Sequence, residues 1–394
     1  MTLISFFFWF CFFIVFYTYI GYGFLLWLLV KLKEAFVPTP VMPVSNPEFP
    51  EVTLFITAYN ESRVVEEKMK NSLSIDYPKE KLHILWVTDG SSDDTVEKLQ
   101  CYMNIHLLHQ PERRGKTAAM NRGMQSVNTP LTVFTDANTM INREAIREIA
   151  RLMNDPNVGC VAGEKRILKQ EKESATGGEG LYWHYESTLK ALDARLYTAV
   201  GAAGELFAIR TSLFEKMPED TLLDDFILSM RIAQKGYRIA YCKKAYAIEN
   251  ASKNIREERK RKVRISAGGI QSVIRLKALF NAFRYGWLSF QYVSHRVLRW
   301  TISPLAFFLL IPLNFALLIQ ETPPFLFYQL TAFLQVVFYF FAFIGWLYSN
   351  KSIHHKFFFI PYYFLFMNLN VIKGFSYFWK RRELPAVWEK AERN

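Results

Sequence analysis

The first thirty residues constrain this chain most, because they contain no charged side chain. The uncharged run MTLISFFFWFCFFIVFYTYIGYGFLLWLLV (1–30) exceeds the roughly 20 residues that a helix needs to cross a bilayer. It has neither a basic N-terminal segment nor a small-residue cleavage site, so we expect a retained membrane helix rather than a signal peptide. Lys31 and Lys33 follow directly. The positive-inside rule places them, and the residues that follow, in the cytoplasm.

More apolar segments occur near the C-terminus. Residues 301–348 contain two long apolar runs joined by the short polar turn QETPP, and we expect a transmembrane hairpin. Another apolar segment, 357–379, is interrupted by two Asn and one Lys. A fourth full span would put the basic tail 380–394 outside, against the positive-inside rule. We therefore expect 357–379 to span imperfectly or to re-enter, in a multi-pass protein of the cell (inner) membrane.

The positive charge of the chain lies close to these membrane segments. The formal net charge is +12, and much of the excess falls in residues 251–300, where basic and apolar residues alternate at helical spacing. This pattern is typical of helices in the membrane interface, which meet anionic lipid rather than nucleic acid. The four cysteines are scattered, without a C-x-x-C motif or a His cluster. They indicate neither a zinc site nor a disulfide framework.

A proline-rich linker (31–50) leads into residues 51–250, where short apolar runs alternate with helical patterns. Strand-like runs at 52–60, 81–95 and 131–139 are separated by helical segments. This βαβα succession predicts an α/β domain with a Rossmann-like, mostly parallel sheet. We divide it into a nucleotide-binding half, about 51–160, and an acceptor half, about 161–250.

Polar residues cluster where the predicted strands end, and parallel sheets bind ligands at that edge. TDGSSDDT (88–95) and FTDANT (134–139) supply carboxylates. Asp136 and Asn138 are two residues apart, so in an extended stretch they point the same way and could hold Mg²⁺ or Mn²⁺. ERRGKT (112–117) adds cations suited to a diphosphate. Each stretch alone could be only a turn with a helix cap, but together they predict a metal-bound nucleotide diphosphate.

Two adjacent carboxylates begin another helical pattern, in TLLDDFILSMRIAQKGYRIAY (221–241). Asp224 and Asp225 suit a helix N-terminus, because the helix dipole favours negative charge there. One of them could equally be a catalytic base at the mouth of a cleft. The two interpretations are compatible, since a helix start holds a carboxylate rigidly.

The ordered set TAYNES, VTDGSSDDT, RGKTAAMNRG, FTDANT, GAAGELFAIR and LLDDFILSMRIAQKGYRI resembles the membrane-bound inverting family-2 glycosyltransferases of the GT-A fold. Similar proteins are bacterial exopolysaccharide synthases and, more distantly, hyaluronan, chitin and cellulose synthases. The resemblance covers about residues 52–270. It implies a cytoplasmic GT-A domain flanked by transmembrane helices.

The resemblance also implies roles for particular residues. Asp225 would be the general base, preceded by Asp224, and Asp136 with Asn138 would stand at the D-x-D metal motif. The residues implied in nucleotide-sugar binding are Ala58, Tyr59, Glu61, Asp89, Lys116, Asp136 and Arg264. The implied reaction moves a sugar from a nucleotide diphosphate sugar, a UDP-sugar by family frequency, to a lipid-linked or polysaccharide acceptor at the cytoplasmic membrane face.

The family's Q-x-x-R-W motif reads RKVRI (261–265) here, so Arg264 matches while Ile265 replaces the tryptophan. Without an aromatic platform under the acceptor sugar, we expect addition of one or a few sugars. Processive synthesis with a partner subunit or a dimer is an alternative. Two others are a nucleotidyltransferase and a non-catalytic membrane subunit that binds a sugar nucleotide and helps to export a chain.

Overall fold

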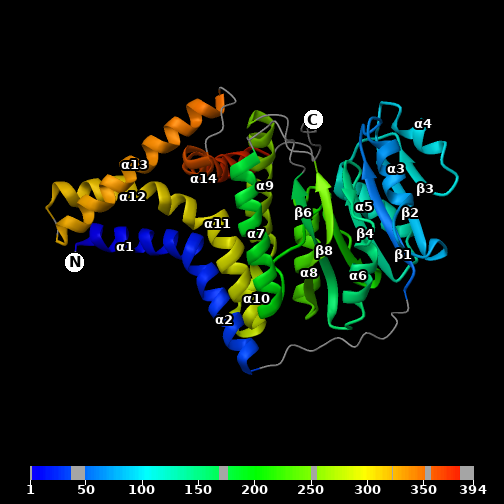
Figure 1. Ribbon diagram of the computed structural model, residues 1–394, viewed down its shortest axis with the longest axis horizontal. Coiled ribbons are helices and arrows are strands. Elements are labelled where there is room, and N and C mark those ends of the chain that lie inside the picture. Colours follow the sequence, from blue (N-terminus) through cyan, green and yellow to red (C-terminus); the bar gives the residue numbers. More distant parts are fainter. Residues whose placement is uncertain are drawn as a thin grey trace.

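The computed structural model describes residues 2–36, 49–167, 176–249, 255–321, 323–350 and 356–381. Most of the expected linker (31–50) and nearly all of the expected basic tail (380–394) therefore lie outside the described residues, as do residues 250–254 at the start of the expected interface segment. The first membrane segment, most of the α/β domain and most of the C-terminal apolar helices are described (Figure 1).

The described residues of the α/β domain form an eight-stranded mixed sheet in the order β3-β2-β1-β4-β7-β6-β8-β5. The four strands from β3 to β4 are mutually parallel, β6 and β8 are parallel, and β7 and β5 run antiparallel to their neighbours. The mostly parallel α/β sheet expected from the sequence is confirmed. The strands are β1 (Val52–Ala58), β2 (Leu82–Asp89), β3 (His106–Gln110), β4 (Leu131–Asp136), β5 (Thr139–Ile141), β6 (Val158–Ile167), β7 (Leu206–Arg210) and β8 (Arg238–Glu249).

Helices cover both faces of this sheet, which explains why its central strands are almost entirely apolar. In β1, Leu54 and Ile56 belong to the core under α3, α4 and α6, whereas Phe55 belongs to the core under α5 and α8. The helices of the domain are α3 (Val65–Leu73), α4 (Thr95–Gln100), α5 (Lys116–Gly123), α6 (Ala145–Met153), α7 (Thr176–Leu196), α8 (Asp224–Gln234) and α9 (Ile255–Arg275). Short 3₁₀ turns occupy Lys79–Lys81, Met124–Ser126 and Thr211–Leu213.

The strand register brings the expected site residues to one edge. Ala58 of β1 pairs with Thr88 of β2, and Thr57 pairs with Asp136 of β4. The carboxyl ends of these three strands are therefore level. The polar residues that follow each strand lie side by side, at the edge where parallel sheets bind ligands.

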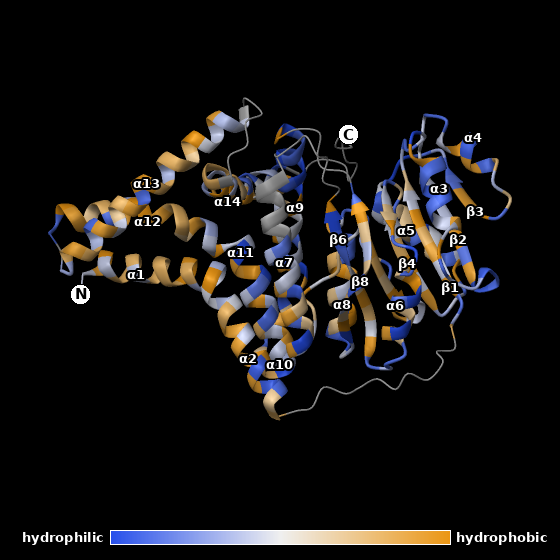
Figure 2. Cartoon of the chain, viewed as in Figure 1, coloured by the Kyte–Doolittle hydropathy of each residue, from blue (hydrophilic) through white to orange (hydrophobic). Residues whose placement is uncertain are grey.

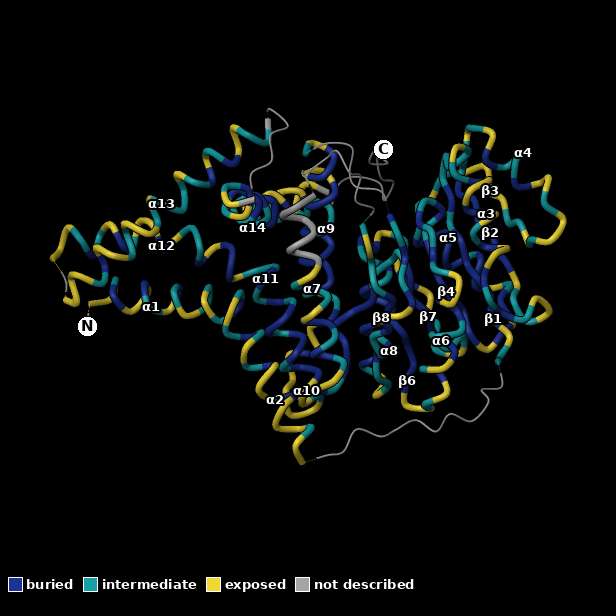
Figure 3. The backbone as a smooth tube through the Cα atoms, in the orientation of Figure 1, coloured by how far each residue is buried: buried dark blue, intermediate teal, exposed yellow. Residues whose placement is uncertain are grey.

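Three helices in the described residues are long and apolar enough to cross a membrane: Leu3–Phe36, Ile302–Ile319 and Phe325–Ser349. The first consists of α1 (Leu3–Phe16), a π-helical turn (Tyr17–Gly21) and α2 (Tyr22–Phe36), and the others are α12 (Ile302–Ile319) and α13 (Phe325–Asn350). Helices α1, α12 and α13 pack together and project away from the sheet (Figure 1). Their surfaces are apolar (Figure 2) and largely exposed (Figure 3), as expected for side chains that face lipid.

Between these helices and the sheet lies a layer formed by α2, α7 and the segments after α9. These segments are a 3₁₀ turn (Lys277–Phe280), α10 (Ala282–Tyr292), a π-helical turn (Val293–Val297) and α11 (Leu298–Trp300). The apolar segment expected at 357–379 forms one helix, α14 (Lys356–Arg381), which packs against α9 and α13. It runs crosswise to α12 and α13 (Figure 1). It is not among the three helices suited to span a membrane, and its membrane placement stays a prediction.

Candidate active site

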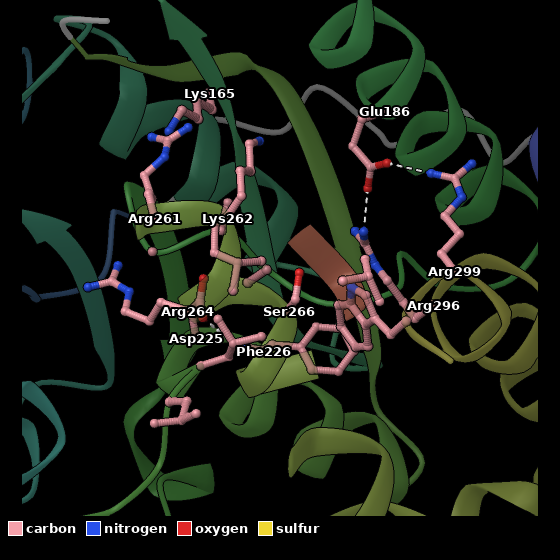
Figure 4. A pocket seen from close by; sticks show the side chains of 18 of the residues that line it. Lys165, Glu186, Asp225, Phe226, Arg261, Lys262, Arg264, Ser266, Arg296 and Arg299 are labelled. Carbon is pink, nitrogen blue, oxygen red and sulfur yellow. Dashed lines mark hydrogen bonds and ion pairs between the residues drawn. The ribbon is translucent and has the colours of Figure 1, made fainter. Parts of the chain in front are cut away.

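A cavity of about 540 Å³ lies between the carboxyl edge of the sheet and the membrane-proximal helices. Asp136, at the end of β4, and Asp225, at the start of α8, line it on the side of the sheet. Residues of α7, α9, α11 and α14 line the rest (Figure 4). The cavity therefore joins residues from the catalytic domain to residues near the membrane.

Asp224 and Asp225 form the first turn of α8, where negative charge is favourable. The Phe226 backbone N–H donates to Asp225 Oδ1 at 2.8 Å and fixes that carboxylate. Burial and the charge of Asp224 together raise the pKa of Asp225 from its ordinary value near 3.8 to about 7, although Lys116 opposes them. A carboxylate that titrates near neutral pH is suited to take and release a proton.

Lys116 links the carboxylates that come from different parts of the chain. Its Nζ lies 2.8 Å from Asp136 Oδ1 and 3.6 Å from Asp224 Oδ2. Burial lowers the pKa of Lys116, but these carboxylates outweigh burial and raise it overall. Gly204 lies against this group, since a Cβ there would be 3.3 Å from Lys116 Nζ and 3.4 Å from Asp225 Oδ2. A glycine leaves the small space that a donor sugar or its phosphates would need.

Asp136 and Asn138 suit a divalent cation. The Asn138 Oδ1 atom is buried and accepts no hydrogen bond within the described residues, so its lone pairs are available to a cation. No group of three His, Cys, Asp or Glu that could hold a metal occurs in the described ranges. A cation would therefore depend on diphosphate and water for its other ligands. Buried Lys68 donates to Thr135 Oγ1 and to the Thr139 carbonyl and holds this turn in place.

The remaining predicted donor-site residues lie along the sheet edge, outside the lining of this cavity. Tyr59 stacks against Arg113, whose guanidinium carbon is 3.7 Å from the ring centre, and Ala58 is buried beside it. The Glu61 backbone N–H donates to the Thr95 hydroxyl at 2.9 Å. These contacts tie the end of β1 to the turns after β2 and β3.

Asp89 has a structural role that the sequence did not indicate. Its buried carboxylate accepts hydrogen bonds from the backbone N–H groups of Arg114, at 3.1 Å, and Gly115, at 2.6 Å. It thereby holds the loop that leads into Lys116. A carboxylate has about four acceptor positions, so this role leaves room for a base or ribose contact.

The RKVRI segment lies on α9, and Arg261, Arg264 and Ile265 all line the cavity. Burial lowers the pKa of Arg264, as does neighbouring Arg261, while Asp136, Asp224 and Asp225 counteract this. A guanidinium with an ordinary pKa above 12 stays charged despite such a shift. Arg264 therefore brings positive charge close to the three carboxylates, and its role in nucleotide-sugar binding stays a prediction.

Trp300 is a cavity residue that the sequence analysis missed. Its ring meets Phe226 edge to face, with ring centres 5.0 Å apart, directly after Asp225. The available signal was the Gly268–Gly269 pair inside an otherwise helical stretch. A Cβ on Gly269 would be 2.5 Å from the Trp300 ring, so the glycine makes room for the indole.

Comparison with known proteins shows the family to which the chain belongs. Residues 50–268 match the family described as "Glycosyltransferase like family 2", and because this is more than half of the chain, the protein belongs to that family of glycosyltransferases. It is 28% identical over 240 residues to a poly-β-1,6-N-acetyl-D-glucosamine synthase of Staphylococcus aureus. It is 25% identical over 256 residues to a probable glycosyltransferase, YdaM, of Bacillus subtilis.

These matches cover 58% and 59% of this chain, and they span only 57% and 58% of the two relatives. Among solved structures, a mannosyltransferase of Pyrobaculum calidifontis in complex with GDP-Man and Mn²⁺ is similar, with a TM-score of 0.68. The likeness covers 91% of this chain and 95% of that one at 20% identity. It confirms the expected GT-A type of fold.

Proposed function

We propose that the chain is an inverting glycosyltransferase that moves a sugar from a nucleotide diphosphate sugar to an acceptor hydroxyl at the cytoplasmic membrane face. The observation that carries this proposal is the meeting of Asp225 with the Lys116–Asp136 pair in one cavity. These residues come from three distant parts of the chain. A base, a cation and a metal-type carboxylate at one point are the groups that displacement of a diphosphate needs.

In the proposed reaction, Asp225 accepts the proton of the acceptor hydroxyl as its oxygen attacks the anomeric carbon. Attack comes from the face opposite the nucleotide, so the configuration inverts. Lys116 and Arg264 offset the charge that develops on the departing diphosphate. A Mg²⁺ or Mn²⁺ ion held by Asp136 and Asn138 would supply further charge stabilisation when bound.

We propose a UDP-sugar as the donor and a glycan or lipid-linked molecule as the acceptor. The family resemblance supports the first choice, and the name of the Staphylococcus aureus relative, a polysaccharide synthase, is consistent with a glycan acceptor. The Pyrobaculum calidifontis mannosyltransferase was solved with GDP-Man, so a GDP-sugar belongs in every donor test. Export with a partner subunit stays an alternative for a polymeric product.

We propose that Trp300 is the aromatic platform for the acceptor sugar. The expectation of a short product rested on Ile265, which replaces the family's tryptophan. Trp300 lines the same cavity and lies next to the residue after the proposed base, so it can offer the apolar face of a sugar ring a flat surface. The presence of Ile265 in place of tryptophan is therefore not by itself evidence against repeated addition of sugars.

The test is transfer of radiolabel from a panel of UDP- and GDP-sugars by the purified protein in lipid nanodiscs. Asp225→Asn should keep nucleotide binding and lose transfer by roughly 10²–10⁴-fold, the usual contribution of a general base. Glu215→Gln, which alters only an exposed pair with Lys235, is the matched control and should transfer normally. Nucleotide binding without transfer from any donor by the wild type would favour the non-catalytic subunit.

A further inference from the structure

Lys190 of α7 is a buried cation without a counterion. Its side chain lines the cavity and is only 7% exposed. Within the described ranges it makes neither a hydrogen bond nor an ion pair, although buried charges are ordinarily paired. Burial lowers its pKa, and so does Arg296, whereas the carboxylates of Glu186, Glu205 and Asp225 oppose this without forming an ion pair with it in the described residues. An unpaired buried ammonium that faces a cavity indicates an anionic ligand.

Two guanidinium groups share one carboxylate next to Lys190 on α7. Glu186, one turn earlier on α7, pairs with Arg296 at 2.6 Å and with Arg299 at 3.0 Å (Figure 4). One carboxylate thus faces two guanidinium groups, and the same carboxylate also lies 3.2 Å from His295. Arg296 and Arg299 line the cavity with Lys190. The group Lys190, Arg296 and Arg299 is therefore held ready for a multivalent anion such as a phosphate.

Another part of the cavity is lined by a row of apolar side chains of α14. Ile360, Phe364, Met367 and Val371 line it at intervals of three to four residues, so one face of α14 covers this end. Tyr19, in the π-helical turn of the first membrane helix, lines the same end. Its hydroxyl donates to Asn368 Oδ1 of α14 at 2.6 Å. The cavity thus extends from Asp225 to a membrane helix.

We propose that the acceptor is an amphiphile in which a sugar hydroxyl reaches Asp225, a phosphate binds Lys190, Arg296 and Arg299, and a hydrocarbon chain lies along α14. This inference rests on the proposed function. The acceptor oxygen forms the new bond to the anomeric carbon while the bond from that carbon to the diphosphate breaks. The nucleotide diphosphate leaves with the electron pair, and Asp225 takes the proton. The acceptor phosphate is bound and does not react.

A hydroxyl is the better nucleophile for this site than the phosphate itself. A phosphate oxygen is already ionised near neutral pH and needs no base. A hydroxyl must lose a proton, and a carboxylate with a pKa of about 7 is suited to accept it. The phosphate is therefore assigned to the cationic group and the hydroxyl to Asp225.

The experiment compares three acceptors that share one sugar, with a donor from the panel above. In the first the sugar is joined through a phosphate to a decyl chain, in the second directly to decyl, and in the third through a phosphate to methyl. We expect kcat/KM for the first to exceed that for either of the others by at least about tenfold, the effect of one charge-assisted hydrogen bond or of partial chain burial. Equal values for the first two would overturn the phosphate subsite, and equal values for the first and third would overturn the hydrocarbon path.

Variants of Lys190 test whether this residue causes the preference for the phosphate-containing acceptor. Lys190→Met removes the charge at similar length and should lower kcat/KM for the phosphate amphiphile at least about tenfold, but less than about twofold for the neutral decyl acceptor. Lys190→Arg should keep the preference, which shows that the fold is intact. Lys235→Met, at a surface pair, is the control. An equal loss on both acceptors, or a raised KM for the nucleotide sugar, would overturn the assignment.

A last measurement distinguishes binding of a lipid-linked phosphate from binding of free phosphate. If inorganic phosphate stimulated transfer to the neutral decyl acceptor as fully as the attached phosphate does, the site would bind free phosphate and the lipid assignment would be wrong. Transfer to all three acceptors without preference would refute this inference alone. Absence of transfer to any acceptor, with no release of sugar from any donor, would instead refute the proposed function.

Discussion

The pH dependence of transfer follows from the position of Asp225. Its carboxylate has an ordinary pKa near 3.8, which burial and the adjacent charge of Asp224 raise to about 7. A raised pKa means that the proton is held until the pH approaches 7. Because only the deprotonated carboxylate can act as a base, activity should be full above this pH and should be lost as the pH falls through it.

The size of the effect is set by the fraction of ionised carboxylate. With a pKa of about 7, about half of the molecules are ionised at about pH 7, about a tenth at pH 6 and about a hundredth at pH 5. The measurement is kcat/KM, which reports the ionisation of the free enzyme, from about pH 5 to about pH 9 at constant ionic strength. We expect a tenfold fall per pH unit below about pH 6.

A flat profile across the acidic range would refute this reasoning, because an Asp of ordinary pKa stays ionised there. Asp224→Asn provides a second test. It removes the like charge, so the inflection should move to lower pH, while burial keeps it above the value of an ordinary Asp. Glu215→Gln, far from the cavity, should leave the inflection where it is. A shift to higher pH in Asp224→Asn would contradict the assigned cause.

Three further predictions concern other groups in the site. EDTA should abolish transfer, Asp136→Ala should lower it at least about 100-fold, and Asn138→Asp should be tolerated because it restores the usual two-carboxylate motif. Gly204→Ala, with its Cβ 3.3 Å from Lys116 Nζ, should lower kcat without loss of fold, as measured by thermal unfolding. Trp300→Ala should raise the acceptor KM about tenfold and shorten the product, whereas Trp300→Phe should retain most of both.

For each of these three predictions, one result would contradict it. Full activity in EDTA would exclude the metal-dependent reaction. A normal kcat in Gly204→Ala would mean that no substrate group passes close to that backbone. Product length is measured by sizing the glycan made by the purified protein with excess donor, and an unchanged distribution in Trp300→Ala would remove Trp300 from the acceptor site.

The site residues of the nucleotide-binding half could be predicted from the sequence, because they lie in short stretches next to recognisable strands. Each strand of β1, β2 and β4 is followed directly by its polar residues, and parallel pairing brings those strand ends together without further information. The start of α8 is local in the same way, since Asp224 and Asp225 precede an apolar helical pattern that ends before Gly236. The strand-end pattern placed Asp136 at this edge, and the resemblance to the family placed Asp225 in the same site.

The cavity residues on the membrane-proximal helices could not be predicted in this way. Trp300 and Lys190 reach the cavity only because α7, α11 and α14 pack against the catalytic domain, and helical periodicity shows which face is apolar but not which neighbour covers it. Asp89 illustrates the same limit. Its place at a strand end was predicted, but its bonds to the backbone of the Arg114–Gly115 loop depend on tertiary folding.

The packing of α14 bears on the course of the chain through the membrane. Phe364 and Met367 of α14 line the cavity that contains Asp225, and we therefore predict that α14 lies on the same side of the membrane as the catalytic domain. A fourth full span would carry the end of the chain to the opposite side. If the three candidate helices all span, α12 would leave the catalytic side and α13 would return to it, as this prediction requires. We infer that this side is the cytoplasm, because Lys31 and Lys33 after the first span and the basic tail then lie together on it, as the positive-inside rule requires. Four spans would place the basic tail outside, whereas the positive-inside rule places it in the cytoplasm. The two agree if α14 covers the active site and does not span the membrane.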